Sequence, residues 1–147
     1  MLSTVTFGLG AHNERMPRID ASTRCPCGTG LTYGECCEPF HAATAKPPTA
    51  ERMMRSRYSA YALGIPSYLL ATWHPSTRPA VATLDPNVQW VGLEILGRTG
   101  GGMLDTKGTV EFRATYRSDG MRMHQHENST FVRQDKTWFY LDGLVDD

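Results

Sequence analysis

The cysteines of this chain constrain its fold more than any other feature. All four lie close together, as Cys25, Cys27, Cys36 and Cys37, and the rest of the sequence has none. One residue separates the first two, and the last two are adjacent. Four thiolates complete a tetrahedral zinc site, and paired ligands around a short glycine-containing turn are typical of small zinc modules. The sequence therefore predicts a zinc knuckle that uses all four cysteines.

The residues around the cysteines support a metal site, although other interpretations stay open. Pro26 stiffens the first pair, whereas Gly28 and Gly30 allow the backbone to fold over a metal. A disulfide framework is disfavoured, because nothing indicates export and adjacent cysteines pair poorly with each other. Four unrelated thiols are disfavoured by the clustering. Iron remains an alternative to zinc, because all-cysteine tetrahedral sites accept either metal. His41 follows a site that is already complete, so we expect it to pack against the knuckle.

Two helices are expected after the knuckle. Thr49 is a good N-cap for a helix that runs to Leu63 and ends at Gly64. A second helix is expected to begin near Pro66 and to end before Pro75.

The remainder of the sequence alternates between apolar and polar residues, as β-strands do. In the first strand we expect Val91, Leu93 and Ile95 on one face and Trp90 on the other. Further strands are expected over residues 110–117, 121–131 and 137–141. Four antiparallel strands after a helical segment predict an α+β fold, in which a curved sheet wraps over helices.

Two levels of resemblance follow from these residues. The stretch Cys25-Pro-Cys-Gly-Thr-Gly-Leu-Thr-Tyr-Gly-Glu-Cys-Cys37 resembles the SEC-C motif, a zinc-binding element of the translocase motor SecA and other bacterial proteins. Residues 54–61, 68–75 and 138–143 resemble the YchJ family. That family joins an N-terminal SEC-C motif to a cone-shaped domain of the kind found in nuclear transport factor and ketosteroid isomerase.

The motif and the pattern of residues around it divide the chain. Residues 1–23 are expected to form a disordered tail, and residues 24–41 the SEC-C zinc knuckle. Residues 42–48 are expected to be a linker, and residues 49–147 the cone-shaped domain.

Composition limits the classes of partner and the location. Fifteen basic and fifteen acidic residues cancel, so no overall charge attracts the chain to nucleic acid or to anionic lipid. No apolar run approaches the ~20 residues that span a bilayer. Four reduced thiols without an export signal indicate the cytoplasm.

Glu127 is the most informative residue of the predicted sheet. The alternation places it on the same face as Met123 and Phe131, where an unpaired carboxylate is costly. We expect an ion pair with Arg55 or Arg57 of the first helix. The alternative role is a general base in the mouth of the cone, with a raised pKa. The other candidate pocket residues are Tyr58, Tyr61, Trp73 and Trp90.

The resemblance favours a docking adaptor over an enzyme. SEC-C knuckles dock proteins, so a protein partner or the ribosome is expected. The candidate docking rim consists of Arg24, Leu31, Tyr33 and Phe40, which a short loop is not expected to bury. The alternative is a small-molecule-binding or lyase- or isomerase-like protein that uses the cone pocket. No catalytic residue is assigned, and cone-shaped domains of this kind often form homodimers through the sheet.

Overall fold

The structure is a computed structural model that describes residues 19–146. Residues 1–18, which make up most of the expected tail, lie outside the described residues. Residues 19–23 lie against the knuckle, because the backbone N–H groups of Tyr33 and Gly34 donate to the carbonyls of Thr23 and Ala21.

Helix α2, Ala50–Leu63, begins and ends where the sequence predicts. The Thr49 side chain accepts a hydrogen bond from the backbone N–H of Arg52, which caps the first turn. Gly64 follows with φ 76°, a left-handed conformation that glycine adopts without strain. Helix α3, Pro66–Ala71, begins where the sequence predicts and ends four residues before Pro75.

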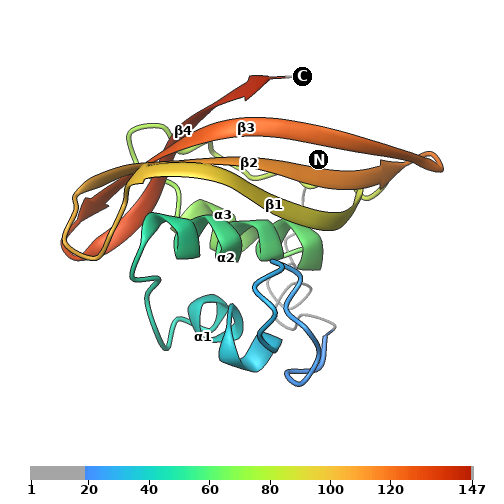
Figure 1. Ribbon diagram of the computed structural model, residues 1–147, viewed down its shortest axis with the longest axis horizontal. Coiled ribbons are helices and arrows are strands. Elements are labelled where there is room, and N and C mark those ends of the chain that lie inside the picture. Colours follow the sequence, from blue (N-terminus) through green and yellow to red (C-terminus); the bar gives the residue numbers. More distant parts are fainter. Residues whose placement is uncertain (1–18, 147) are drawn as a thin grey trace.

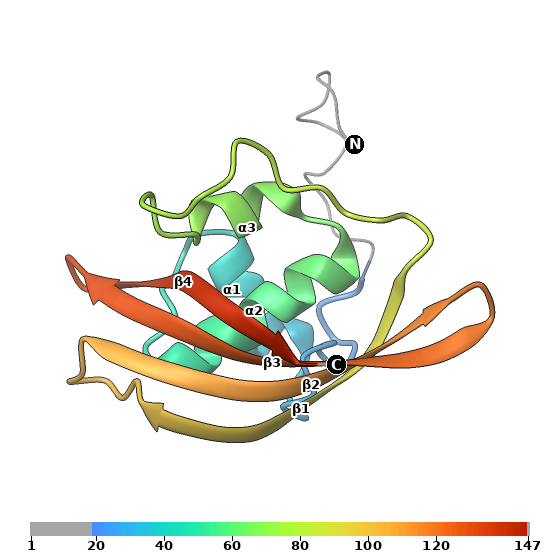
Figure 2. The same ribbon diagram turned by 90° about the horizontal axis from the view of Figure 1, so that it is seen from above.

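The four strands form one antiparallel sheet in the order β1-β2-β3-β4. Their bounds are β1 Gln89–Gly100, β2 Lys107–Ser118, β3 Met121–Gln134 and β4 Thr137–Asp146. The sheet curves over α2, and the β2–β3 hairpin extends beyond the helices (Figures 1 and 2). This confirms the α+β fold, a curved antiparallel sheet over helices with a cysteine cluster at its N-terminal side.

A β-bulge changes the faces of β1 from those that simple alternation predicts. Trp90 pairs with Tyr116 and Gly92 with Thr115, so Val91 is an extra residue between them. Trp90 and Leu93 consequently both pack against the core, while Val91 is exposed. The prediction that Val91 shares a face with Leu93 was wrong, because the bulge reverses the alternation at this point.

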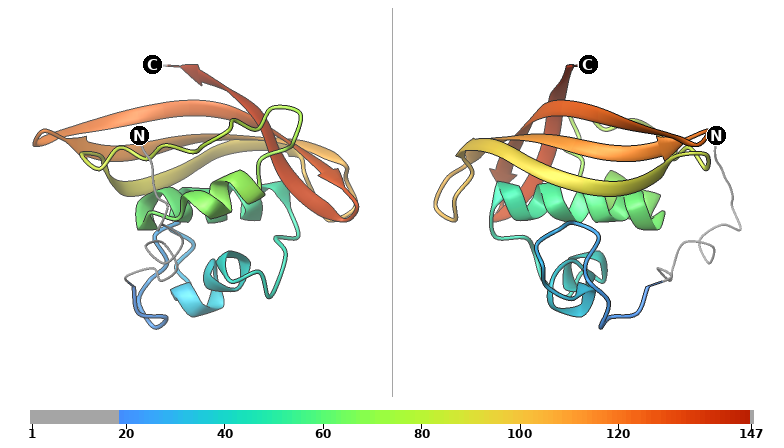
Figure 3. Two further views of the ribbon diagram at one scale, coloured as in Figure 1. Left: turned by 180° about the vertical axis from the view of Figure 1, so that it is seen from behind. Right: turned by 45° about the vertical axis from the view of Figure 1, so that its right-hand side comes forward.

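Helix α2 is the central layer of three. The sheet covers one side of it, and the knuckle with helix α1, Glu38–His41, lies on the opposite side (Figures 1 and 3). The main core runs through all three layers. Its buried members include the four cysteines together with Tyr33, Met53, Tyr58, Phe112, Phe131 and Trp138.

The expected linker, residues 42–48, packs against the start of β4. Pro47 is buried, and the Pro48 carbonyl accepts a hydrogen bond from the Trp138 indole. The Lys46 ammonium donates to the Thr137 hydroxyl of β4.

Within the described part of the chain, none of the helices has the length and apolar character needed to cross a membrane.

Candidate metal centre and candidate pocket

The four cysteines converge at one point beneath α2. All four residues are buried, and their Sγ atoms lie within 4.8 Å of one another. The Sγ atoms of Cys27 and Cys36 are 3.5 Å apart, and those of Cys36 and Cys37 are 3.8 Å apart. A Zn–S bond of about 2.3 Å places the sulfurs of a tetrahedral site about 3.8 Å from one another. The sulfurs therefore have the spacing of a four-coordinate metal centre.

The chemistry of the thiols also fits a cation. Hydrogen bonds from Cys25 and Cys37 hold the pKa of Cys27 far below its usual range. Burial raises the pKa of Cys36 to about 11, and the pKa of Cys37 is raised because its thiol donates to Cys25 and Cys27. Ionisation of Cys36 and Cys37 is opposed within the cluster, and a positive charge at its centre would favour it.

Hydroxyl groups surround the sulfurs. The Ser59 hydroxyl, from α2, lies 3.4 Å from Cys37 Sγ and 3.6 Å from Cys25 Sγ. The Thr29 hydroxyl lies 3.2 Å from Cys36 Sγ. Such neighbours fix the orientation of metal ligands and tune their basicity.

Two further contacts attach the knuckle to α2. The Arg55 guanidinium donates to the Cys27 carbonyl at 2.7 Å. The His41 ring lies between Tyr33 and α2, with Nδ1 2.7 Å from the Tyr33 hydroxyl and Nε2 2.9 Å from the Ser56 carbonyl. His41 packs against the knuckle, as predicted, and is not part of the cysteine cluster.

The structure divides the candidate docking rim. Arg24 is exposed and Leu31 is 43% exposed. Tyr33 and Phe40 are only 1% and 7% exposed, so the expectation that these two form an exposed rim was wrong. Both pack where the knuckle meets the helices, since Tyr33 contacts His41 and the Phe40 ring lies under the Arg52 guanidinium.

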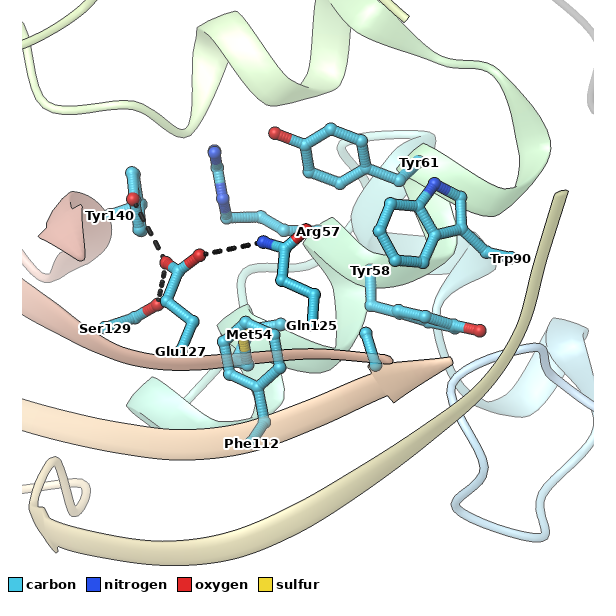
Figure 4. Close-up of a pocket in the computed structure, with 11 residues that line it drawn as sticks. Met54, Arg57, Tyr58, Tyr61, Trp90, Phe112, Gln125, Glu127, Ser129 and Tyr140 are labelled. Carbon is cyan, nitrogen blue, oxygen red and sulfur yellow. Dashed lines mark hydrogen bonds between the residues drawn. The ribbon is translucent and has the colours of Figure 1, made fainter. Parts of the chain in front are cut away.

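A cavity of about 200 Å³ lies between α2 and the concave face of the sheet (Figure 4). Its apolar walls come mainly from Met54, Tyr58, Tyr61, Trp90 and Phe112. Its polar wall comes from Arg57, Gln125, Glu127, Ser129 and Tyr140. Tyr58, Tyr61, Trp90 and Glu127 thus lie where the sequence predicts.

Trp73 does not line this cavity, contrary to its prediction as a pocket residue. Its ring packs edge-on against Tyr140 at 5.1 Å and lies 5.0 Å from the Arg57 guanidinium. Because α3 ends at Ala71, Trp73 lies beyond the helix and pairs with Tyr140 of β4. Trp73 therefore contacts two residues that line the cavity, Arg57 and Tyr140, without lining it itself.

Glu127 is held by hydroxyl and amide groups and not by an arginine. Its carboxylate accepts from Ser129 at 2.6 Å, from Tyr140 at 3.3 Å and from the Gln125 amide at 3.3 Å. No ion pair within 4.0 Å joins it to an arginine or lysine of the described residues. The predicted ion pair with Arg55 or Arg57 was therefore wrong.

The two arginines are engaged elsewhere. Arg55 bonds to Glu51 and to the knuckle. Arg57 is 3% exposed and donates through Nη1 to the Leu69 carbonyl and the Thr72 hydroxyl. Its guanidinium is also 4.5 Å from the centre of the Tyr140 ring, and burial lowers its pKa. Backbone and hydroxyl acceptors draw it away from Glu127.

Comparison with known proteins identifies both parts of the chain. Residues 22–39 match the SEC-C motif, and residues 49–143 match the family described as the YchJ middle NTF2-like domain. The chain belongs to the YchJ family. The resemblance inferred from the sequence is thereby confirmed.

Relatives of this YchJ-family chain are similar over most of their length. A UPF0225 protein of Streptomyces coelicolor is 53% identical over 81% of this chain and 93% of its own. One of Corynebacterium efficiens is 51% identical over 86% and 96%.

Solved structures of similar proteins share the fold. The solution structure of a SEC-C motif containing protein of Rhodopseudomonas palustris superposes with a TM-score of 0.73 at 34% identity, covering 84% of this chain and 98% of that one. The crystal structure of a SEC-C motif containing protein from Psychrobacter arcticus gives 0.69 at 30% identity, with coverage of 86% and 85%.

Several residues of the two candidate sites were not identified from the sequence. Ser59 is a serine within a helix, and only the packing of the knuckle on α2 brings it to the sulfurs. Tyr140 is one of three consecutive aromatic residues in β4. Gln125 and Ser129 could have been found, because each lies two residues from Glu127 and strand alternation places them on its face.

Proposed function

We propose that this protein binds a small polar molecule in the cavity between α2 and the sheet, and that a Zn²⁺ knuckle keeps α2 in place. One observation carries the proposal. Arg57, Gln125 and Glu127 converge on a cavity whose other walls are largely aromatic. Enclosed apolar pockets with a few converging polar groups are the usual form of small-molecule sites.

The metal has a supporting role in this proposal. The four cysteine sulfurs would hold Zn²⁺ in a closed site, which leaves no position for a substrate. Bound there, the ion would supply charge compensation for thiolates and would order the knuckle. Through Ser59, Arg55 and His41 this order is passed to α2, which carries Arg57, Tyr58 and Tyr61 of the pocket.

Nuclear magnetic resonance with a panel of small molecules tests the pocket. The indole N–H signal of Trp90 reports on the cavity. That of Trp138 is a matched control, because Trp138 is buried and bonded to the Pro48 carbonyl outside the lining. We expect ligands to shift the Trp90 signal, to leave the Trp138 signal in place and to lose binding in Trp90→Ala. A panel in which no molecule shifts the Trp90 signal would contradict the proposal.

A second candidate function is docking to a protein or to the ribosome through the tip of the knuckle. The observation that favours it is an exposed apolar side chain, Leu31, close to the exposed cation Arg24. An isolated backbone β-bridge between Arg24 and Thr32 brings the two together. Ribosome co-sedimentation should weaken in Leu31→Asp and should be unchanged in Leu104→Asp. Leu104 is a suitable control because it is 93% exposed and lies in the β1–β2 loop. Equal sedimentation of both variants and the wild type would remove this candidate.

A further inference from the structure

The pocket contains two buried charges of opposite sign that do not pair with each other. Arg57 is 3% exposed and Glu127 is 8% exposed, and both line the same cavity. No ion pair within 4.0 Å joins them. Buried charges are costly when they lack a partner of opposite charge. Their separation leaves room for a ligand that contacts both.

Arg57 retains donors for such a ligand. A guanidinium has five N–H groups. Nη1 donates to the Leu69 carbonyl and the Thr72 hydroxyl, and the Tyr61 hydroxyl also accepts a hydrogen bond from the guanidinium. The remaining donors belong to a planar group held between the rings of Trp73 and Tyr140. A rigid guanidinium with unused N–H groups is suited to a carboxylate.

Glu127 retains acceptor capacity. An ionised carboxylate accepts about four hydrogen bonds, and Ser129, Tyr140 and Gln125 supply three. Gln125 also contributes an amide oxygen to the same wall. An ammonium group placed here would gain a charged acceptor and a neutral one.

We propose that the ligand is a small zwitterion of the α-amino acid type, with its carboxylate on Arg57 and its ammonium group on Glu127. Its side chain would lie against Tyr58, Tyr61 and Trp90. This inference rests on the proposed binding function and specifies the ligand class. The cavity of about 200 Å³ is smaller than the ~300–1,000 Å³ of drug-sized pockets, which limits the ligand to about the size of one amino acid.

The zwitterion is favoured over ligands with a single charge. A carboxylate without an amine would satisfy Arg57 but would leave Glu127 as a second anion in the same cavity. An amine without a carboxylate would meet the same difficulty with Arg57. Only a ligand with both charges compensates both walls, so removing either charge should weaken binding strongly.

Calorimetric titration with matched compounds tests the inference. The probes are L-leucine, 4-methylpentanoate, which lacks the amine, and 3-methylbutylamine, which lacks the carboxylate. We expect L-leucine to bind at least about ten-fold more tightly than either analogue, as loss of one charged contact requires. L-phenylalanine with 3-phenylpropanoate and phenethylamine repeats the test with a ring that suits the aromatic wall.

A variant adds a second, independent readout. Glu127→Gln should lower the affinity for L-leucine about ten-fold and should leave or improve the affinity for 4-methylpentanoate. Arg57→Lys, which keeps the charge but not the planar group, should weaken L-leucine and 4-methylpentanoate together. Circular dichroism of each variant checks that it folds. If a variant does not fold, the titrations of the wild-type protein still test the inference.

The outcomes separate the inference from the proposed function. If other molecules shift the Trp90 signal but the amino acids bind no more tightly than their singly charged analogues, the zwitterion is wrong and the binding function stands. If no compound binds at all, both are wrong.

Discussion

The knuckle and the pocket lie on opposite sides of α2 and use polar groups in opposite ways. In the knuckle, the polar groups bond to one another. The Ser59 hydroxyl lies beside sulfur, and Arg55 bonds to the Cys27 carbonyl. The His41 ring joins the Tyr33 hydroxyl to the Ser56 carbonyl. In the pocket, Arg57 and Glu127 remain apart beside unfilled space. The first arrangement favours rigidity, and the second favours a ligand. Substitutions on the two sides should therefore differ in what they damage.

The largest effect is expected from Cys36→Ser. Three remaining cysteines leave the site open, so stoichiometric metal binding should be lost. Loss of a structural metal is among the few changes that cost more than about 4 kcal/mol of unfolding free energy. Native mass spectrometry measures the metal and urea unfolding the stability, with the exposed residue Met121→Ser as control. An unaltered metal content in Cys36→Ser would show that the cluster is not the metal centre.

A smaller loss is expected from His41→Phe. The ring volume is kept, but the buried Tyr33 hydroxyl loses its partner, which should cost about 2 kcal/mol. His74→Phe is the matched control, because its ring nitrogens contact Ser76 and Gln134 in partly exposed positions. Urea unfolding of both variants measures the difference. Equal losses would mean that His41 does not fasten the knuckle to α2.

His41 should also make stability depend on pH. Burial lowers its pKa, so the folded protein favours the neutral ring. The resulting stability is complete above the unfolded pKa of about 6.5 and is lost as the pH falls from there through the lower folded value. The stability gap between the wild type and His41→Phe should therefore narrow as the pH falls from 7.5 to 5.5. A constant gap over that range would contradict a neutral His41.

Ser59→Ala should lower stability modestly and should lower metal affinity more clearly. It removes the hydroxyl near Cys25 and Cys37, at a cost of about 1 kcal/mol. Second-sphere changes of this kind typically weaken metal affinity about 10- to 100-fold. Competition with a chelator measures the affinity. A variant with wild-type competition would show that Ser59 serves packing alone.

The smallest effect on stability is expected from Glu127→Gln, at less than about 1 kcal/mol without ligand. Because no arginine pairs with Glu127, removing its charge leaves no partner uncompensated. Thermal unfolding measures this. A loss near that of His41→Phe would mean that the pocket charge is structural, and the contrast between the two sides of α2 would disappear.

Features fixed by short-range signals could be predicted from the sequence. The ends of α2 follow from Thr49 and Gly64, and the convergence of the four cysteines follows from their spacing. Alternation correctly placed Glu127 on the inner face of β3, whose pairing with β2 has no bulge. It failed in β1, because the extra residue Val91 has no distinctive sequence signal.

Features that depend on how separate segments meet were not predicted. The burial of Tyr33 and Phe40 follows from the packing of the knuckle on α2, which no local pattern encodes. The position of Arg57 was missed for the same reason. Its choice of the Leu69 carbonyl over Glu127 depends on where the short helix α3 ends against α2.

The side of α2 that faces the knuckle is unusual for a buried helix surface, because it carries Arg52, Arg55, Ser56 and Ser59. Ser56 and Ser59 are fully buried, yet water could satisfy all four side chains if the knuckle were absent. The same helix also carries apolar residues, Met53 and Ala60, that belong to core clusters shared with the knuckle and with Phe40. A different knuckle placed on this helix would therefore have to offer acceptors to the two arginines and apolar cover to Met53 and Ala60.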